Sequence, residues 1–203
     1  MTKRENNQRK EEMDLRLKEI ELERAELEYE EKLREQHDRT QLNYYFFGEV
    51  SEEKVLAAIE KINTWSRHNQ ETDLHVTLNS PGGYVVDGLA LHDFLLNIPN
   101  HVTITCFGQA SSMGSIILQA GDSRVMGRNA LVLIHEPSFG SYGNMHRHKD
   151  TVECSDIMWE NMLQILSERS TMSVNEIRKQ AQRKDWWLSA NEALKLGFVD
   201  EVI

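Results

Sequence analysis

The chain has 203 residues and a net charge of −10, which allows one globular domain with a substantial core plus an appendage. The acidic balance argues against general nucleic-acid binding, which requires a basic face. Cys106 and Cys154 lie in unrelated contexts without metal-type spacing, so the sequence predicts no disulfide framework and favours a reducing compartment. The apolar runs are too short to cross a membrane and the N-terminus is charged, so we expect a soluble, cytoplasmic protein without a membrane partner.

The first forty residues differ in composition from the rest of the chain. They contain ten Lys or Arg and thirteen Asp or Glu, without glycine or proline, and strong helix formers dominate. Apolar side chains recur in two stripes, but neither stripe forms a clean heptad. We therefore expect residues 1–40 to be a charged helical or partly disordered extension, either solvated or packed on a partner. Residues 41–203 are expected to form the globular domain.

From Leu42 onward, β-prone segments alternate with segments of helical length. The expected strands cover residues 42–48, 74–78, 101–107, 124–126, 131–134 and 198–203. The expected helices begin near residues 51, 84, 112, 145, 173 and 189, and the last ends at Gly197. A Ser-x-x-Glu pattern predicts capping boxes at 173–176 and 189–192. This alternation predicts an α/β fold with parallel strand pairs and right-handed crossovers.

The alternation stops after Pro137. Residues 138–143 are rich in glycine and predict an exposed loop or edge strand, and a long helix is expected from about 145 to 170. His146 and His148 lie in the first turns of that helix, where they resemble a pair of metal ligands. We expect no metal site there, because no further ligands stand at zinc-type spacing.

The serine-rich corner after the third strand is the first candidate for chemistry. Ser111, Ser112 and Ser115 lie where a strand leads into a helix, whose first turn has unpaired N–H groups and the positive end of the dipole. A hydroxyl at this position is either a helix cap or a nucleophile with oxyanion donors beside it. The residue types alone do not separate the three serines.

Two further motifs follow neighbouring strands. The Gly-Gly turn at residues 79–83 (NSPGG) offers backbone N–H groups to a phosphate or to an oxyanion. The sequence has neither the lysine of a P-loop nor GxGxxG, so we do not expect a nucleotide. His135 follows the strand 131–134, where a structural role is the alternative to a catalytic one. Because the carboxyl ends of parallel strands meet at one edge of a sheet, the turn, a serine and His135 would together supply the parts for acyl transfer.

Four motifs in this order and spacing resemble the ClpP family, the proteolytic subunits of the Clp proteases. They are NSPGG (79–83), GQASSMG (108–114), IHEP (134–137) and KDWWLSANEA (184–193). The resemblance covers the chain from about residue 44 to 203. It implies the ClpP/crotonase-like fold and a serine endopeptidase that needs no cofactor or metal of its own.

The resemblance also implies the roles of individual residues. The nucleophile falls on Ser112, the general base on His135 and the orienting acid on Asp185. The oxyanion donors fall on the backbone N–H groups of Gly83 and Met113. These roles follow the ordinary logic of serine proteases.

An assembly is implied as well. Members of the family form heptameric rings, and two rings stack into a tetradecamer around a chamber for unfolded polypeptides. A hexameric AAA+ unfoldase uses ATP to feed the chamber. Residues 137–170 correspond to the handle that joins the rings, whereas the charged extension 1–40 departs from the short pore loop typical of the family.

Other functions fit parts of the sequence. A catalytically silent subunit that only builds or gates a mixed ring usually lacks a triad residue, and all three positions are filled here. An acyl-CoA enzyme of the related crotonase fold shares the oxyanion-hole plan, but the Ser-Met-Gly and His-Glu-Pro motifs argue against it. A Ser–Lys peptidase needs a desolvated lysine, and no lysine lies near the serine corner in the sequence.

Overall fold

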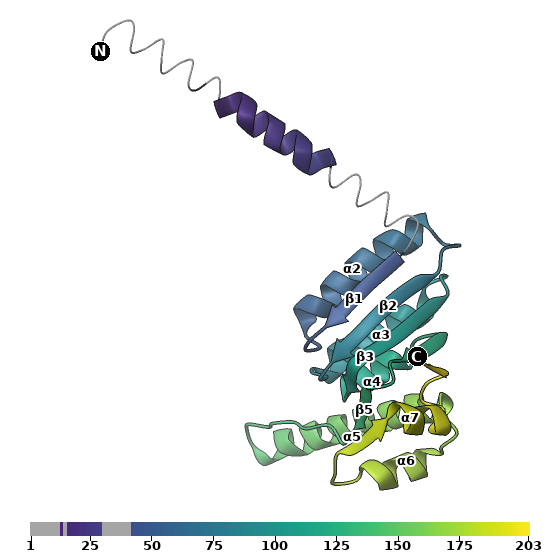
Figure 1. The fold of residues 1–203 in the computed structure, drawn as a ribbon. Helices are drawn as coiled ribbons and strands as arrows, with labels where there is room; N and C mark the ends of the chain where they lie inside the picture. The colour runs from purple at the N-terminus through teal and green to yellow at the C-terminus, as the bar shows by residue number, and fades with distance from the viewer. Residues whose placement is uncertain (1–12, 14–15, 30–41) are drawn as a thin grey trace, which may run out of the picture. The chain divides into compact units, whose positions relative to one another are not determined.

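The computed structural model describes residues 13, 16–29 and 42–203 (Figure 1). The chain divides into two compact units, Met1–Thr40 and Gln41–Ile203. Residues 16–29 are helical and their side chains are exposed. Apart from Met13, which is also helical and exposed, the rest of the predicted extension lies outside the described residues, and the role of the extension stays a prediction.

Seven strands of the described chain form one sheet. They are β1 (Leu42–Phe47), β2 (Leu74–Ser80), β3 (Val102–Ser111), β4 (Ser123–Met126), β5 (Leu131–Ile134), β6 (Trp186–Ser189) and β7 (Glu201–Val202). The strands β1-β2-β3-β4-β7 follow one another across the sheet, β5 lies beside β3, and β6 lies beside β5. Every pair is parallel except β5–β6, which is antiparallel. The predicted α/β fold with a mostly parallel sheet is confirmed.

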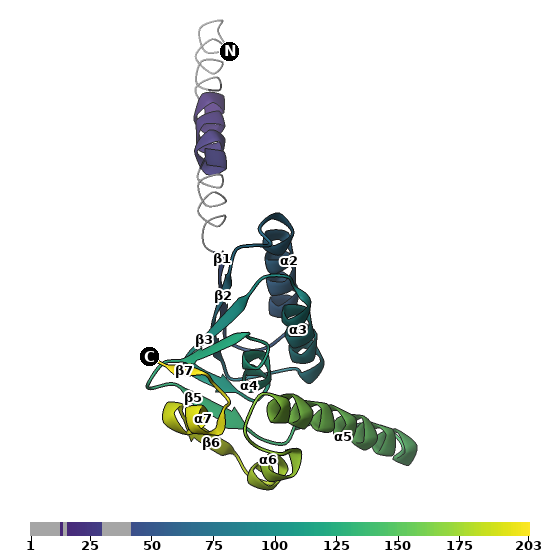
Figure 2. The ribbon, with the colours of Figure 1, turned by 90° about the vertical axis from the view of Figure 1, so that its right-hand side faces the viewer.

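Six labelled helices accompany the sheet. They are α2 (Glu52–His68), α3 (Val85–Asn97), α4 (Met113–Leu118), α5 (Met145–Glu168), α6 (Val174–Ala181) and α7 (Ala190–Leu196). Helices α2 and α3 lie side by side along one face of β1, β2 and β3 (Figure 2). The core lies between these layers, where Leu78, Ile104, Met113 and Ile117 are fully buried. Both predicted capping boxes are present, at Ser173 and Ser189.

Strand β3 differs most from its prediction, and it positions the serine corner. The sequence predicted a strand that ends at residue 107, but β3 continues through Gly108 to Ser111. Gly108 adopts φ +78°, a conformation that favours glycine. Before it, β3 pairs with β4, and after it, β3 pairs with β5. The bend therefore lets one strand serve two neighbours and carries the serines to the side of β5.

Strand β6 is absent from the sequence-based prediction. It has only four residues, so its alternation of apolar and polar positions is too short to indicate a strand. The last strand is shorter than expected and contains only Glu201 and Val202. These two corrections alter the C-terminal part of the sheet but leave the fold class unchanged.

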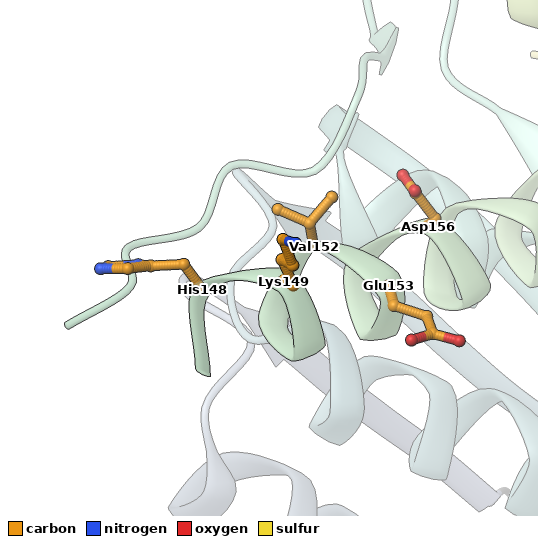
Figure 3. A pocket seen from close by; sticks show the side chains of 5 residues that line it. All are labelled: His148, Lys149, Val152, Glu153 and Asp156. Carbon is orange, nitrogen blue, oxygen red and sulfur yellow. The ribbon is translucent and has the colours of Figure 1, made fainter. Parts of the chain in front are cut away.

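Helix α5 extends away from the rest of its unit (Figure 2). The exposed segment 138–143 contacts its first turns, where Nδ1 of His148 lies 2.8 Å from the Ser141 hydroxyl. An open groove of about 340 Å³ lies along the helix, lined by His148, Lys149, Val152, Glu153 and Asp156 (Figure 3). The long helix is confirmed, whereas its role as a handle between rings stays a prediction.

No group of three or more His, Cys, Asp or Glu side chains in the described chain converges to hold a metal ion. Within the same residues, no helix is long and apolar enough to span a membrane.

Candidate active site

Three strand ends bring the predicted triad residues together. The last residue of β3, Ser111, pairs with Leu133 of β5, and the Ser112 N–H donates to the Leu133 carbonyl over 2.9 Å. On its other side, β5 pairs with β6, and the last pair is Ile134 with Trp186. Ser112 follows β3 directly and therefore lies at the end of this three-strand group.

The same register brings His135 and Asp185 close together. His135 follows the last paired residue of β5, and Asp185 precedes the first residue of β6. Because the two strands are antiparallel, these residues lie opposite each other one step beyond the ladder. His135 is half-buried and Asp185 is exposed. Segments separated by about fifty residues in sequence thus meet at one end of the sheet.

Ser112 has an unusual backbone conformation. Its φ of 52° and ψ of −120° fall in a region that residues with a Cβ atom rarely adopt. Such a residue costs about 1–3 kcal/mol and persists only where the surrounding structure enforces it, most often at functional sites. A strained strand-to-helix turn that exposes a serine hydroxyl is the arrangement of the nucleophile in many hydrolases. The alternative of a helix cap is not supported, because the Ser112 side chain makes no capping hydrogen bond to α4.

Hydrogen bonds and burial separate the three serines that the residue types alone left equivalent. Ser111 is 2% exposed, and its hydroxyl donates to Oε1 of Gln109 over 2.9 Å. Ser115 is 1% exposed, and its hydroxyl donates to the Ser112 carbonyl over 2.7 Å. Ser112 is half-buried, and its hydroxyl has no hydrogen-bond partner within residues 42–203. Of the three hydroxyls, that of Ser112 is the one available for chemistry.

The Gly-Gly turn lies directly against this corner. A Cβ atom on Gly82 would come within 2.6 Å of the Ser112 Cβ and 3.1 Å of the Met113 nitrogen, so only glycine fits. Gly83 pairs with Val50 in an isolated parallel β-bridge. The N–H groups of Gly83 and Met113 donate no hydrogen bond within the described part of the chain. Two donors without a partner in the described chain therefore belong to the residues that directly follow Gly82 and Ser112.

The side chains of the predicted triad are not joined by hydrogen bonds in the described part of the chain. In residues 42–203, no hydrogen bond joins the Ser112 hydroxyl to His135 or His135 to Asp185. Catalytic hydrogen bonds often become short and aligned only when substrate is bound. The strand pairing thus brings the backbone of the three residues to one end of the sheet.

A hydrogen bond between Glu136 and Arg183 was not predicted from the sequence. A carboxylate oxygen of Glu136, the residue after His135, accepts a hydrogen bond of 3.1 Å from the Arg183 N–H. Arg183 has φ 57° and is, with Ser112, one of the two non-glycine residues with positive φ in the described chain. Adjacency to His135 was the only signal in the sequence that could have pointed to Glu136.

Comparisons with known proteins cover this whole region. Residues 29–203 match the family described as Clp protease. The chain is 31% identical over 156 residues to "ATP-dependent Clp protease proteolytic subunit 1" of Leifsonia xyli subsp. xyli. The aligned region covers 76% of this chain and 79% of the relative. It is 32% identical over 160 residues to "ATP-dependent Clp protease proteolytic subunit" of Streptococcus mutans serotype c, which covers 77% of this chain and 81% of the relative.

Proposed function

The chain belongs to the Clp protease family, and we propose that it is a serine endopeptidase with Ser112 as its nucleophile. The single observation that carries this proposal is the strained Ser112 turn, whose hydroxyl is the only unengaged one among the three serines of the corner. No observation favours a silent ring subunit, since serine, histidine and aspartate all stand at the three converging strand ends.

The reaction follows from the positions of the groups. His135 accepts the proton from the Ser112 Oγ as this oxygen attacks the carbonyl carbon of the scissile peptide bond. The N–H groups of Gly83 and Met113 donate to the oxyanion of the tetrahedral intermediate. His135 then gives its proton to the leaving amine, and water releases the acyl group from Ser112 by the same steps in reverse. Asp185 accepts from the imidazole and holds its tautomer.

The glycines of residues 79–83 support the oxyanion assignment. Gly82 approaches Ser112 more closely than any residue with a side chain could. Gly83 has φ +155°, and a Cβ atom on it would lie 2.1 Å from the Val50 carbonyl oxygen. Both glycines therefore permit a backbone path in which the Gly83 N–H stays unpaired beside the nucleophile. A donor held in place before reaction stabilises developing charge without the cost of reorganisation.

The assembly proposed for this chain is suggested by the names of its relatives, which are ATP-dependent proteolytic subunits. We place this chain in two stacked heptameric rings that enclose the active sites, with residues 137–170 joining the rings. A hexameric AAA+ unfoldase hydrolyses ATP and delivers unfolded polypeptides. The subunit itself needs no cofactor for its chemistry, because protein groups supply the nucleophile, the base and the oxyanion donors.

Covalent labelling tests the nucleophile directly. A fluorophosphonate should phosphonylate Ser112 in the assembled protein, as located by mass spectrometry of the tryptic peptides. The label should disappear in His135→Ala, because the hydroxyl then lacks its base. An unlabelled Ser112 in assembled rings would instead favour the silent subunit. A short fluorogenic peptide should be cleaved without ATP, whereas a folded protein should require the unfoldase.

A further inference from the structure

Glu136 and Arg183 form the one hydrogen bond that joins residues 182–185 to the segment after β5 within the described chain. The other backbone bonds of this loop are local, since the N–H groups of Gln182 and Lys184 donate to carbonyls of α6. The loop leads from α6 into β6 and contains Asp185. The position of this aspartate relative to His135 therefore depends on the β5–β6 ladder and on a single side chain.

The geometry of the ladder explains why that side chain is Glu136. Directly opposite residues of an antiparallel pair carry their side chains on the same face, with Cβ atoms about 4.5–5.5 Å apart. One step beyond the pair Ile134–Trp186, His135 lies opposite Asp185, and both side chains belong to one face. Glu136 comes next and belongs to the other face, where it reaches the Arg183 N–H without obstructing the triad.

Arg183 needs this support because its backbone is strained. Its φ of 57° places an arginine in the left-handed region, which costs a residue with a Cβ atom about 1 kcal/mol or more. The Glu136 carboxylate oxygen that accepts from the N–H of this residue ties it to the segment after β5. The bond therefore holds the loop in a conformation that it would otherwise leave.

We infer that Glu136 is a positioning residue that holds the loop 182–185 so that Asp185 faces His135. It touches neither substrate nor the reacting atoms, and it acts through Asp185. The inference rests on the proposed triad. It assigns to the residue after the general base a function that the order of the motifs does not reveal.

Three substitutions of Glu136 separate the effect of its side-chain length from the effect of its charge. Glu136→Asp keeps the charge but shortens the side chain, so its carboxylate no longer reaches Arg183. Glu136→Gln loses the charge but keeps an oxygen at the same reach. Glu136→Ala loses both. We expect Glu136→Asp and Glu136→Ala to lower kcat about tenfold with little change in KM, because a misplaced catalytic group costs rate. Glu136→Gln should stay within about twofold of wild type, because it retains an acceptor.

A double-mutant cycle identifies the route of the effect. In an Asp185→Asn background, Glu136→Asp should cause no further loss of kcat, because its effect passes through Asp185. All variants are assayed as assembled rings on a short fluorogenic peptide, after gel filtration and thermal melting verify the fold. If Glu136→Ala fails to fold, the comparison of Glu136→Asp with Glu136→Gln still decides the test.

The outcomes that overturn the inference are distinct from those that overturn the triad. A positioning role for Glu136 would be excluded if Glu136→Asp lowered kcat by the same factor in the wild type and in the Asp185→Asn background. It would also be excluded if Glu136→Asp were active and Glu136→Gln inactive. If Asp185→Asn itself retained wild-type kcat, the proposed triad would fail, and this inference would fail with it.

Discussion

The Ser112 corner and the interior around Arg124 use polar groups in opposite ways. Arg124 is 5% exposed, and its guanidinium donates to the Asp200 carboxylate, to Oε1 of Gln119 and to the Arg169 carbonyl. The backbone N–H of Arg124 also donates to Asp200, over 2.8 Å. This network joins β4, the C-cap of α4, the segment before β7 and the C-cap of α5, so one buried side chain connects four parts of the fold.

The Ser112 corner leaves three of its polar groups unengaged. The Ser112 hydroxyl and the N–H groups of Gly83 and Met113 have no partner within residues 42–203. Unpaired groups in a folded interior are rare and each calls for an explanation. The fold is therefore stabilised where polar groups satisfy one another, and chemistry is available where they do not.

The largest effect is expected at the corner. Ser112→Ala should lower kcat about 10⁶-fold, because the nucleophile is lost, as in other serine proteases. Ser111→Ala is the matched control, since that hydroxyl is buried against Gln109 and should leave kcat per folded assembly at the wild-type level. Peptide hydrolysis by purified rings measures both. A large loss in the Ser111 variant, with Ser112→Ala still active, would reverse the assignment of the nucleophile.

The next effect concerns stability and belongs to the network. Asp200→Asn leaves the buried guanidinium of Arg124 without its counter-charge, and because Asp200 itself is about half exposed, we expect the free energy of unfolding to fall by about 1–3 kcal/mol. Glu201→Gln changes an exposed neighbouring carboxylate and should alter stability by less than about 0.5 kcal/mol. Urea unfolding at equal protein concentration compares the two. Equal stabilities would mean that the network is dispensable.

The network also predicts how stability depends on pH. Partial burial alone would raise the pKa of Asp200, but hydrogen bonds from the Arg124 side chain and backbone outweigh burial and lower this pKa below its usual value. A lowered pKa contributes stability that is present above the pKa of the unfolded chain and is lost as the pH falls through that of the folded chain. The stability difference between wild type and Asp200→Asn should therefore shrink below about pH 4. Urea unfolding midpoints of both proteins at pH 7 and in acid measure this stability difference. If the stability difference did not change with pH, the pKa argument would be refuted.

The sequence contained most of the fold because its elements are long or carry local signals. The capping boxes at Ser173 and Ser189 and the stop at Gly197 are local, and the structure has all three. Strand β6 has four residues and forms because β5 offers an edge to pair with, which no local pattern indicates. The strand pairing that brings Asp185 to His135 was thus the part of the fold least visible in the sequence.

The candidate site divides in the same way. The four motifs and their resemblance pointed to Ser112, His135, Asp185 and the two N–H donors. The sequence could not distinguish the three serines by chemistry, because burial and hydrogen bonds to Gln109 and to the Ser112 carbonyl depend on the folded corner. Glu136 was missed because its partner lies 47 residues away and is a backbone N–H, which has no sequence signature.

The smallest predicted effect tests whether the corner stores strain. Glycine adopts the backbone conformation of Ser112 without the steric penalty of a Cβ atom, although it loses more entropy on folding. We expect Ser112→Gly to unfold with a free energy about 1 kcal/mol higher than Ser112→Ala, which keeps the Cβ atom. Both variants lack the hydroxyl and are inactive, so the comparison separates strain from chemistry. If the two unfold at the same urea concentration, the Ser112 turn is relaxed, and the unpaired hydroxyl alone distinguishes this corner from the network. If Ser112→Gly is more stable, the fold gives up stability at the position of the proposed nucleophile.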